Sequence, residues 1–302
     1  MAEADVEILS RAAAVFTDTA PGWHAQRAML ARARAAHGAA FRNEEALTQW
    51  FRFILLPASR AWAFKPNGKT GTTSLLHALF ELEFGVPLTV SHHEPDGILE
   101  DHAVHRLAEA RVFSPLTALR GAPCALDVLE KALRLTIVRH PMSRALSAFR
   151  YLCRADARAV SRFLRERLRM NAITGFDWQR DPDTPDGFRR FLDFVAHELE
   201  HQASLPLDWH IGPQVLNVRP EIFQPDLVGR TEDVPAFLAE IAARLDRPLP
   251  ERLRRAAPRN RAAMRPPDWA GDRALRARVA QVFAADFDAF GYDPAHIPEA
   301  AP

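Results

Sequence analysis

The sequence contains few cysteines and no long apolar run. Only Cys124 and Cys153 occur among 302 residues, which is too few for a disulfide framework and favours a reducing compartment. No run of roughly 18 apolar residues occurs that could cross a membrane. The first residues are acidic and lack the basic start and apolar stretch of a signal peptide. We therefore expect a soluble, cytoplasmic protein without a transmembrane segment.

The chain also has almost no net charge. Its formal charge of +1 gives no general attraction to nucleic acid or to an anionic membrane, so an anion site must be built from local donors. We therefore expect no nucleic-acid partner. Arginine and alanine are strongly preferred over lysine, which is compatible with a GC-rich bacterial genome.

The pattern of apolar residues divides the chain into a helical front and an α/β body. Residues 1–55 are rich in Ala and Arg, which predicts two or three helices broken near Pro21-Gly22 and Gly38. Further along, short apolar runs alternate with helical patterns, and these runs are 61–64, 86–90, 135–138 and 227–228. We predict a helical N-terminal extension over 1–55 and one domain over 56–302. Its fold class is α/β, a mostly parallel sheet flanked by helices.

Two of the three lysines lie in one turn, Lys65 and Lys69. Residues 61–64 predict a buried strand, Pro-Asn-Gly at 66–68 ends it, and apolar residues then recur at helical spacing. A turn between a strand and a helix directs backbone N–H groups and a helix N-terminus at one spot. The segment adds the Lys69 ammonium and the hydroxyls of Thr70, Thr72, Thr73 and Ser74. We interpret it as an oxyanion cradle, the alternative being an ordinary capped helix.

A second junction of strand and helix follows at Arg139. Residues 135–138 predict a buried strand, and Pro141 suits the first position of the next helix. Arg139 therefore emerges at the carboxyl end of a strand, where open α/β sheets bind ligands, on the same rim as Lys69. Ser147, further along the helix, could converge with Arg139 on one phosphate. The alternative is a surface arginine and a tolerated helical serine.

Together the two junctions resemble the sulfotransferases that use 3′-phosphoadenosine 5′-phosphosulfate (PAPS), most closely the carbohydrate branch. Residues 69–74 match that family's loop, roughly P-K-x-G-T-T/S, with Gly68 where proline is usual. The family's R-x-P-x-x-R-x-x-S segment is matched by Arg139, Pro141, Arg144 and Ser147. Weaker matches lie at 210–214 (H-x-x-P-Q), 228–232 and 287–292. The resemblance covers about residues 60–295.

The resemblance implies a P-loop-like sulfotransferase fold. It also implies an enzyme that takes PAPS as donor and needs no metal. The loop that would cradle the 5′-phosphosulfate comprises Lys69, Thr70, Gly71, Thr72, Thr73 and Ser74. Arg139 and Ser147 would grip the 3′-phosphate, and the acceptor would be a saccharide or glycolipid. Because sulfuryl transfer builds negative charge on the bridging oxygen that leaves, the Lys69 ammonium is also the predicted catalytic cation.

The acceptor hydroxyl needs a general base, because its pKa lies far above neutrality. Family members with a histidine base often place it just after the second strand. Here residues 86–90 are followed by His92, His93 and Glu94, and either histidine suits the role. The alternative is that both are solvated loop histidines. His210 and Glu94 are further candidates for the acceptor site, and a loop-bracing role is an alternative for His210.

A relaxed Walker A pattern gives a rival interpretation of the Lys69 loop. Ala63, Gly68, Lys69 and Thr70 satisfy it, which would indicate a kinase or nucleotide hydrolase that uses ATP and magnesium. Such an enzyme needs a strand ending in Asp to hold magnesium, whereas the strand over 135–138 is followed by Arg139. A non-catalytic nucleotide-binding or glycan-binding module is a further alternative, which turnover of the donor would exclude.

Residues 197–201 also match the H-E-x-x-H zinc pattern, with Glu221 at a plausible distance for a third ligand. Their helix has a continuous apolar stripe, and at helical spacing His197 and His201 point almost opposite to it, toward solvent. The stretch from Leu205 to Pro225 is too proline-rich to bring Glu221 back to the two histidines on the second helix that such zinc sites usually have. We therefore predict no metal site.

Overall fold

The computed structural model describes residues 23–92, 103–119, 124–201, 207–254 and 267–296. Its sheet has five strands, β1 (Leu55–Leu56), β2 (Trp62–Lys65), β3 (Ser114–Pro115), β4 (Leu133–Val138) and β5 (Leu227–Arg230). The strand order is β3-β1-β2-β4-β5. β2, β4 and β5 run parallel, and β1 pairs antiparallel with both β2 and β3. The predicted α/β class with a mostly parallel sheet is confirmed.

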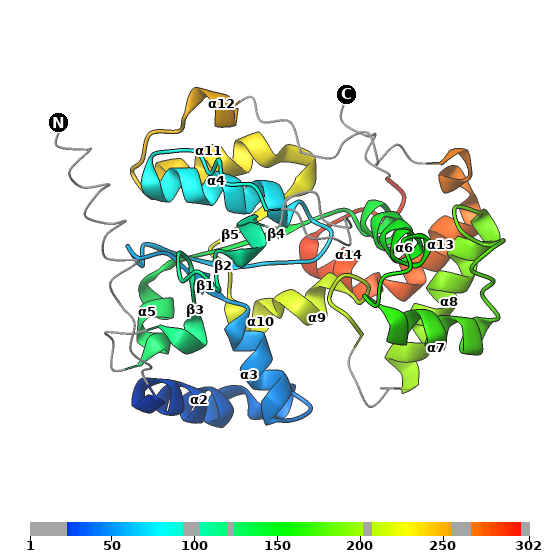
Figure 1. Cartoon of the computed structure of the whole chain (residues 1–302), viewed down its shortest axis with the longest axis horizontal. Helices are drawn as coiled ribbons and strands as arrows, with labels where there is room; N and C mark the ends of the chain where they lie inside the picture. Colours follow the sequence, from blue (N-terminus) through cyan, green and yellow to red (C-terminus); the bar gives the residue numbers. More distant parts are fainter. Residues whose placement is uncertain (1–22, 93–102, 120–123, 202–206, 255–266, 297–302) are drawn as a thin grey trace.

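Helices cover both faces of this sheet (Figure 1). One face packs against α4 (Thr72–Phe84) and α11 (Val234–Arg244), and the other against α2 (Trp23–His37), α3 (Glu44–Arg52) and α5 (Ala125–Lys131). Side chains alternate along β2, so Trp62 and Phe64 join the first cluster and Ala63 joins the second. β2 is buried on both faces and apolar up to its last residue, Lys65, which is why the sequence pattern identified it.

A second, helical core stands beside the sheet. It is built by α6 (Pro141–Ala157), α7 (Leu164–Thr174), α8 (Pro185–His201), α13 (Arg273–Val282) and α14 (Ala284–Phe290). Phe149 of α6 contacts Phe176, Phe188 and Phe191 through ring pairs 5.6 to 6.1 Å apart. The remaining α-helices are α9 (Gln214–Val218), α10 (Pro220–Phe223) and α12 (Glu251–Arg254).

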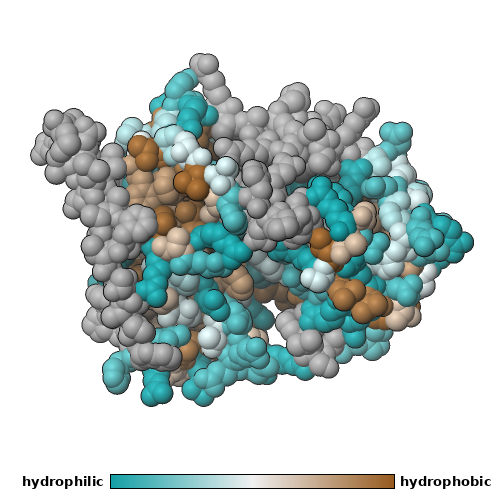
Figure 2. All heavy atoms as spheres, viewed as in Figure 1, coloured by the Kyte–Doolittle hydropathy of each residue, from teal (hydrophilic) through white to brown (hydrophobic). Residues whose placement is uncertain are grey.

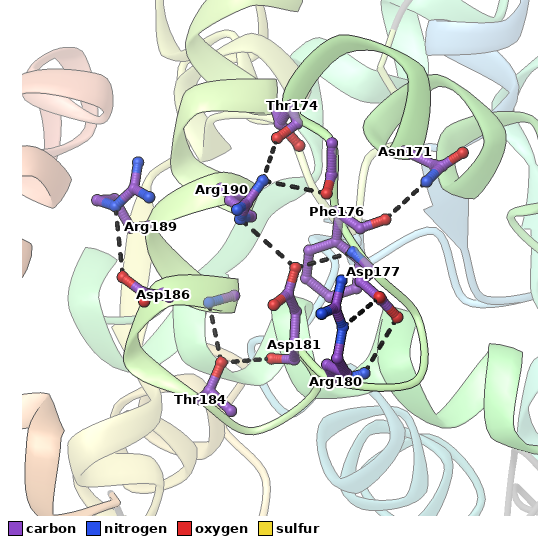
Figure 3. Close-up of polar contacts among 12 residues, drawn as sticks. Asn171, Thr174, Phe176, Asp177, Arg180, Asp181, Thr184, Asp186, Arg189 and Arg190 are labelled. Carbon is purple, nitrogen blue, oxygen red and sulfur yellow. Dashed lines mark hydrogen bonds and ion pairs between the residues drawn. The ribbon is translucent and has the colours of Figure 1, made fainter.

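The connection between α7 and α8 is fixed by polar contacts (Figure 3). Arg190 of α8 donates to the carbonyls of Thr174 and Gly175 at 2.5 and 3.0 Å and pairs with Asp181 at 3.5 Å. The hydroxyl of Thr184 accepts from Gly187 N at 3.0 Å, which satisfies a donor in the first turn of α8. These contacts hold α7 and α8 together where both helices pack against α6, the helix that follows Arg139.

Two sequence predictions about strands need correction. Residues 86–90 form no strand, and Val86 and Val90 are 50% and 64% exposed. Their apolar character does not reflect a place inside the sheet. The short antiparallel strands β1 and β3 were not predicted. A two-residue strand leaves no periodic pattern, since it is defined by the partner that it pairs with.

The N-terminal helices pack closely onto the sheet. Met29 of α2 and Trp50 of α3 share an apolar cluster with Leu56 and Ala63. The predicted break at Gly38 is a 3₁₀ turn between α2 and α3, while Pro21-Gly22 lies outside the described residues. The domain boundary at residue 55 stays a prediction.

None of the helices in the described residues is both long enough and apolar enough to cross a membrane. In Figure 2, the coloured part of this face is largely polar, and apolar residues gather in separate groups.

Candidate active site

The Lys69 loop joins β2 to α4 and leaves the start of α4 open. The N-cap of α4 is Gly71, whose φ is +76° and which has no side chain to bond the first N–H groups of the helix. An uncapped N-terminus directs N–H donors and the positive end of the helix dipole toward an anion. Lys69 itself has a φ of +65°, a conformation that costs free energy in a residue with a Cβ. The loop therefore leaves N–H donors open at the start of α4, while its role as an oxyanion cradle stays a prediction.

Threonine hydroxyls shape this loop from within. Those of Thr70 and Thr72 donate to the carbonyl of Asn67 at 2.7 and 2.6 Å and so close the turn. Thr70 is fully buried. The hydroxyl of Thr73 lies 3.1 Å from Nε2 of His105. The amide nitrogens at the start of α4, together with Lys69, are therefore the donors best placed to receive a ligand.

Gly68 packs directly against the backbone that precedes α9. A Cβ at Gly68 would lie 2.7 Å from the carbonyl oxygen of Trp209 and 2.8 Å from Cα of His210, so a larger residue does not fit. This contact explains why glycine stands where the sulfotransferase pattern usually has proline. Arg144 of α6 secures it, because its guanidinium donates to the carbonyls of Gly68, Trp209 and Gly212 at 2.9, 2.8 and 2.7 Å.

Arg139 emerges at the carboxyl end of β4 beside the Lys69 loop. Because β2 and β4 are neighbouring parallel strands, their carboxyl ends share one rim of the sheet. Nη1 of Arg139 donates to the carbonyl of Lys69 at 3.4 Å. Burial lowers the pKa of Arg139, and the Glu232 carboxylate opposes that shift. Ser147 is half-buried on α6. Among the described residues, no hydrogen bond joins its side chain directly to Arg139.

The Lys69 ammonium lies in a cluster of cations around Tyr151 of α6. Its Nζ is 3.7 Å from the centre of the Tyr151 ring, a cation–π contact. The guanidinium groups of Arg154 and Arg162 lie 5.9 and 5.8 Å from the same ring centre. Burial lowers the pKa of Lys69 to about 7, and repulsion from Arg154 and Arg139 contributes. A bound anion would relieve this repulsion.

His210 contacts the same tyrosine. The two ring centres are 5.5 Å apart. Nδ1 of His210 lies 2.6 Å from Oδ1 of Asp208, which also accepts from the backbone N–H of His210 at 2.8 Å. Burial lowers the pKa of His210, and the Asp208 carboxylate opposes that shift. Sequence reasoning singled out His210 and missed Asp208 and Tyr151, although the Asp-x-His spacing was a visible signal.

The other predicted bases are less defined by the structure. His92 is exposed and ends the first described segment. It follows residues 86–90, which form no strand, so the arrangement of a histidine directly after a strand is not found there. His93 and Glu94 lie outside the described residues. The roles of all three stay predictions.

The two rival motifs receive no support from their surroundings. In the described segments, no group of three or more His, Cys, Asp or Glu side chains is placed to hold a metal ion. On α8 the rings of His197 and His201 stack on each other, 4.1 Å apart, and Glu198 pairs with Arg169. β4 is followed by Arg139, so it supplies no carboxylate for a magnesium ion bound at the Lys69 loop.

Comparison with known proteins agrees with the sulfuryl-transfer interpretation. A family model described as Sulfotransferase family matches residues 90–293, more than half of the chain. No curated protein and no solved structure matches the chain. The matched range includes Arg139, Ser147 and His210 but begins after the Lys69 loop, so the role of that loop depends on its geometry. The resemblance noted from the two junctions is confirmed, and the chain belongs to the sulfotransferase family, whose members transfer sulfuryl groups.

Proposed function

We propose that this sulfotransferase takes PAPS as donor and transfers its sulfuryl group to a hydroxyl of a saccharide or glycolipid. The observation that carries the proposal is the contact between Arg139 and the Lys69 loop on one rim of the sheet. PAPS presents a 3′-phosphate and a 5′-phosphosulfate, two anionic groups on one ribose. Two cations at the ends of neighbouring strands suit such a ligand.

Each junction has its own part in holding the donor. Residues 69–74 would bind the 5′-phosphosulfate, chiefly through the N–H groups at the start of α4 and the Lys69 ammonium. Arg139 would bind the 3′-phosphate with its planar guanidinium, and Ser147 would add a hydroxyl from the following helix. Arg144 is engaged by three carbonyls and serves the position of the loop rather than the ligand.

Lys69 would supply the main electrostatic contribution to the reaction. As the bond from sulfur to the bridging oxygen breaks, negative charge grows on the 5′-phosphate, and an ammonium at that point stabilises it. The anionic donor would raise the pKa of Lys69 from about 7 and so keep the side chain protonated.

An aromatic pair supports a saccharide acceptor. Phe53 and Trp209 stack with ring centres 5.5 Å apart and planes 25° apart. Phe53 is 45% exposed, and Trp209 directly precedes His210. Large aromatic rings at a site edge offer an apolar surface to the face of a sugar. The Trp209 carbonyl lies against Gly68, the residue before Lys69, so this end of the pair stands at the Lys69 loop.

A ligand panel followed by a transfer assay tests this function. Melting temperature is measured with adenosine 3′,5′-bisphosphate (PAP), adenosine 5′-monophosphate (AMP), ATP with magnesium, and zinc, because a ligand that binds the folded state stabilises it by mass action. We expect PAP to give the largest rise. Radiolabelled PAPS is then incubated with chondroitin, heparosan, lactose and galactosylceramide. A larger rise with ATP and magnesium, or PAPS left intact with every acceptor and with water, would contradict the proposal.

A further inference from the structure

His210 pairs one ring nitrogen with a carboxylate, and its side chain is 14% exposed. Its Nδ1 is bound by Asp208 at 2.6 Å, which favours the tautomer that carries its proton on Nδ1. Among the described residues Nε2 has no hydrogen-bond partner, and it is not one of their fully buried unpaired polar atoms. Because the side chain is partly exposed and Nε2 is unpaired among the described residues, its lone pair is available to accept a proton from a ligand.

This nitrogen belongs to the site that contains Lys69. The His210 ring and the Lys69 ammonium both contact Tyr151, the first at 5.5 Å between ring centres and the second at 3.7 Å from its ring centre. The backbone of His210 also packs on Gly68, the residue before Lys69. A general base must lie near the atom at which charge develops, and these contacts bring His210 there.

The charged groups around His210 come from three segments. Asp208 lies on its own loop, Lys69 lies in the loop before α4, and Arg162 lies between α6 and α7. Tyr151 of α6 and Phe163 pack against the ring without charge, Phe163 at 5.8 Å between ring centres. The carboxylate favours the protonated imidazole and the two cations oppose it, so a histidine in this place can both take up and release a proton.

Provided that the proposed PAPS-dependent transfer is correct, we infer that His210 is the general base for the acceptor hydroxyl and that Asp208 is its positioning residue. The alternative is that the pair only braces its loop, because Asp208 also accepts from the His210 backbone. A brace needs no accessible Nε2 and no closeness to Lys69. The two roles therefore differ in what they predict about pH and about proton transfer.

The reaction balances with the groups present. The acceptor oxygen forms a bond to sulfur while the bond from sulfur to the bridging oxygen of the 5′-phosphate breaks. The electron pair of the broken bond stays on that phosphate, where Lys69 neutralises the charge. The hydroxyl proton passes to Nε2 of His210 and then to solvent when the sulfated product and PAP leave. No oxidant, reductant or metal takes part in these steps.

The test compares kcat across pH at saturating PAPS for the wild-type enzyme, His210→Ala, His210→Gln and Asp208→Asn. The acceptor is the most active of chondroitin, heparosan, lactose and galactosylceramide. Where none of them is sulfated, water is the acceptor and release of PAP is followed. The exposed His24 on α2 gives a matched control, His24→Ala. Melting temperature and PAP affinity are recorded for each variant to separate catalysis from folding.

We expect kcat of the wild type to rise with pH through a histidine pKa and then level, because the neutral imidazole is the active form. In both His210 variants the rise of kcat with pH should disappear, and kcat should fall by about 10²–10⁴-fold. Their affinity for PAP should stay the same. Added imidazole should restore part of the rate to His210→Ala, which leaves a space, and not to His210→Gln. Asp208→Asn should shift the rise of kcat to lower pH, because the imidazolium loses its carboxylate partner.

Three results would overturn the inference. The first is a rise of kcat with pH that is unchanged in both His210 variants. The second is a fall in melting temperature and PAP affinity large enough to explain the lower rate, without rescue by imidazole. The third is a rise of kcat with pH that disappears in His92→Ala or His93→Ala instead. Failure of the proposed function looks different. In that case the wild-type enzyme itself neither binds PAP nor consumes PAPS.

Discussion

The side-chain amide of Gln214 bonds both backbone groups of Arg139. Its Oε1 accepts from the Arg139 N–H at 2.9 Å, and its Nε2 donates to the Arg139 carbonyl at 2.8 Å. Oε1 also accepts from Nδ2 of Asn67 at 3.1 Å. Gln214 is fully buried and thus ties the end of β4 to the turn that carries Lys69.

This link predicts that Gln214→Leu will loosen the site and the fold together. The change leaves the N–H and carbonyl of Arg139 buried without partners, and each such group costs about 1–3 kcal/mol. We expect the free energy of unfolding, measured by urea titration, to fall by at least about 2 kcal/mol. PAP affinity should fall as well. Gln49, exposed on α3, provides the control, since Gln49→Leu should leave both quantities nearly unchanged. Equal stability of the two variants would show that the Gln214 bonds are replaced without cost.

Lys69→Met should raise stability while slowing transfer. Burial lowers the pKa of Lys69 to about 7 in the folded protein, far below its value in the unfolded chain. Holding the charged ammonium therefore destabilises the fold fully below pH 7, and this cost shrinks as pH rises toward the unfolded pKa. We expect Met to raise the melting temperature more at pH 6 than at pH 9. Transfer should fall by about 10²-fold or more, because the leaving oxygen loses its cation.

The control for this variant is Lys131→Met, at an exposed end of α5. It should change neither melting temperature nor rate appreciably. A Lys69→Met protein with a lower melting temperature at pH 6 would mean that the cation–π contact with Tyr151 outweighs the burial of charge. Undiminished transfer would mean that the leaving oxygen is stabilised by another group.

The same pKa predicts a pH dependence of donor capture. In the free enzyme Lys69 loses its proton as pH rises through about 7, so kcat/KM for PAPS should decline above that pH. With the donor bound, its negative charge raises the pKa of Lys69, and the decline in kcat should appear at higher pH. Steady-state kinetics over pH 5.5 to about 9.5 measure both profiles. If kcat/KM and kcat declined at the same pH, the bound donor would not change the pKa of Lys69.

Sequence reasoning identified the parts of the fold that have local causes. β2 and the second half of β4 are buried on both faces, so their apolar runs are visible without knowledge of the neighbours. β5 lies at the edge of the sheet and buries one face only, with Val228 44% exposed. Residues 86–90 have a similar composition and lie exposed, because nothing in a short apolar run specifies a pairing partner. β1 and β3 exist through antiparallel pairing alone.

The same division applies to the site. Arg139 and Lys69 could be placed on one rim because parallel neighbouring strands end on the same side. The approach of His210 to Tyr151 depends on how the loop before α9 packs on α6, with Arg144 fixing it by three carbonyl bonds. Contacts of this kind join residues far apart in the chain, and no local spacing reveals them.

Arg139→Ala and Ser147→Ala should weaken recognition of the 3′-phosphate. A charge-assisted hydrogen bond contributes about 1.5–3 kcal/mol and a neutral hydroxyl nearer 1 kcal/mol. We therefore expect Kd for PAP, measured by calorimetry, to rise about tenfold or more in Arg139→Ala and about fivefold in Ser147→Ala. Kd for AMP, which lacks the 3′-phosphate, should change little. Ser143, half-buried one turn earlier on α6, provides the matched control as Ser143→Ala. If both site variants preferred PAP over AMP as strongly as the wild type, the 3′-phosphate would be bound by other residues, and the division of the donor between the two strand ends would be wrong.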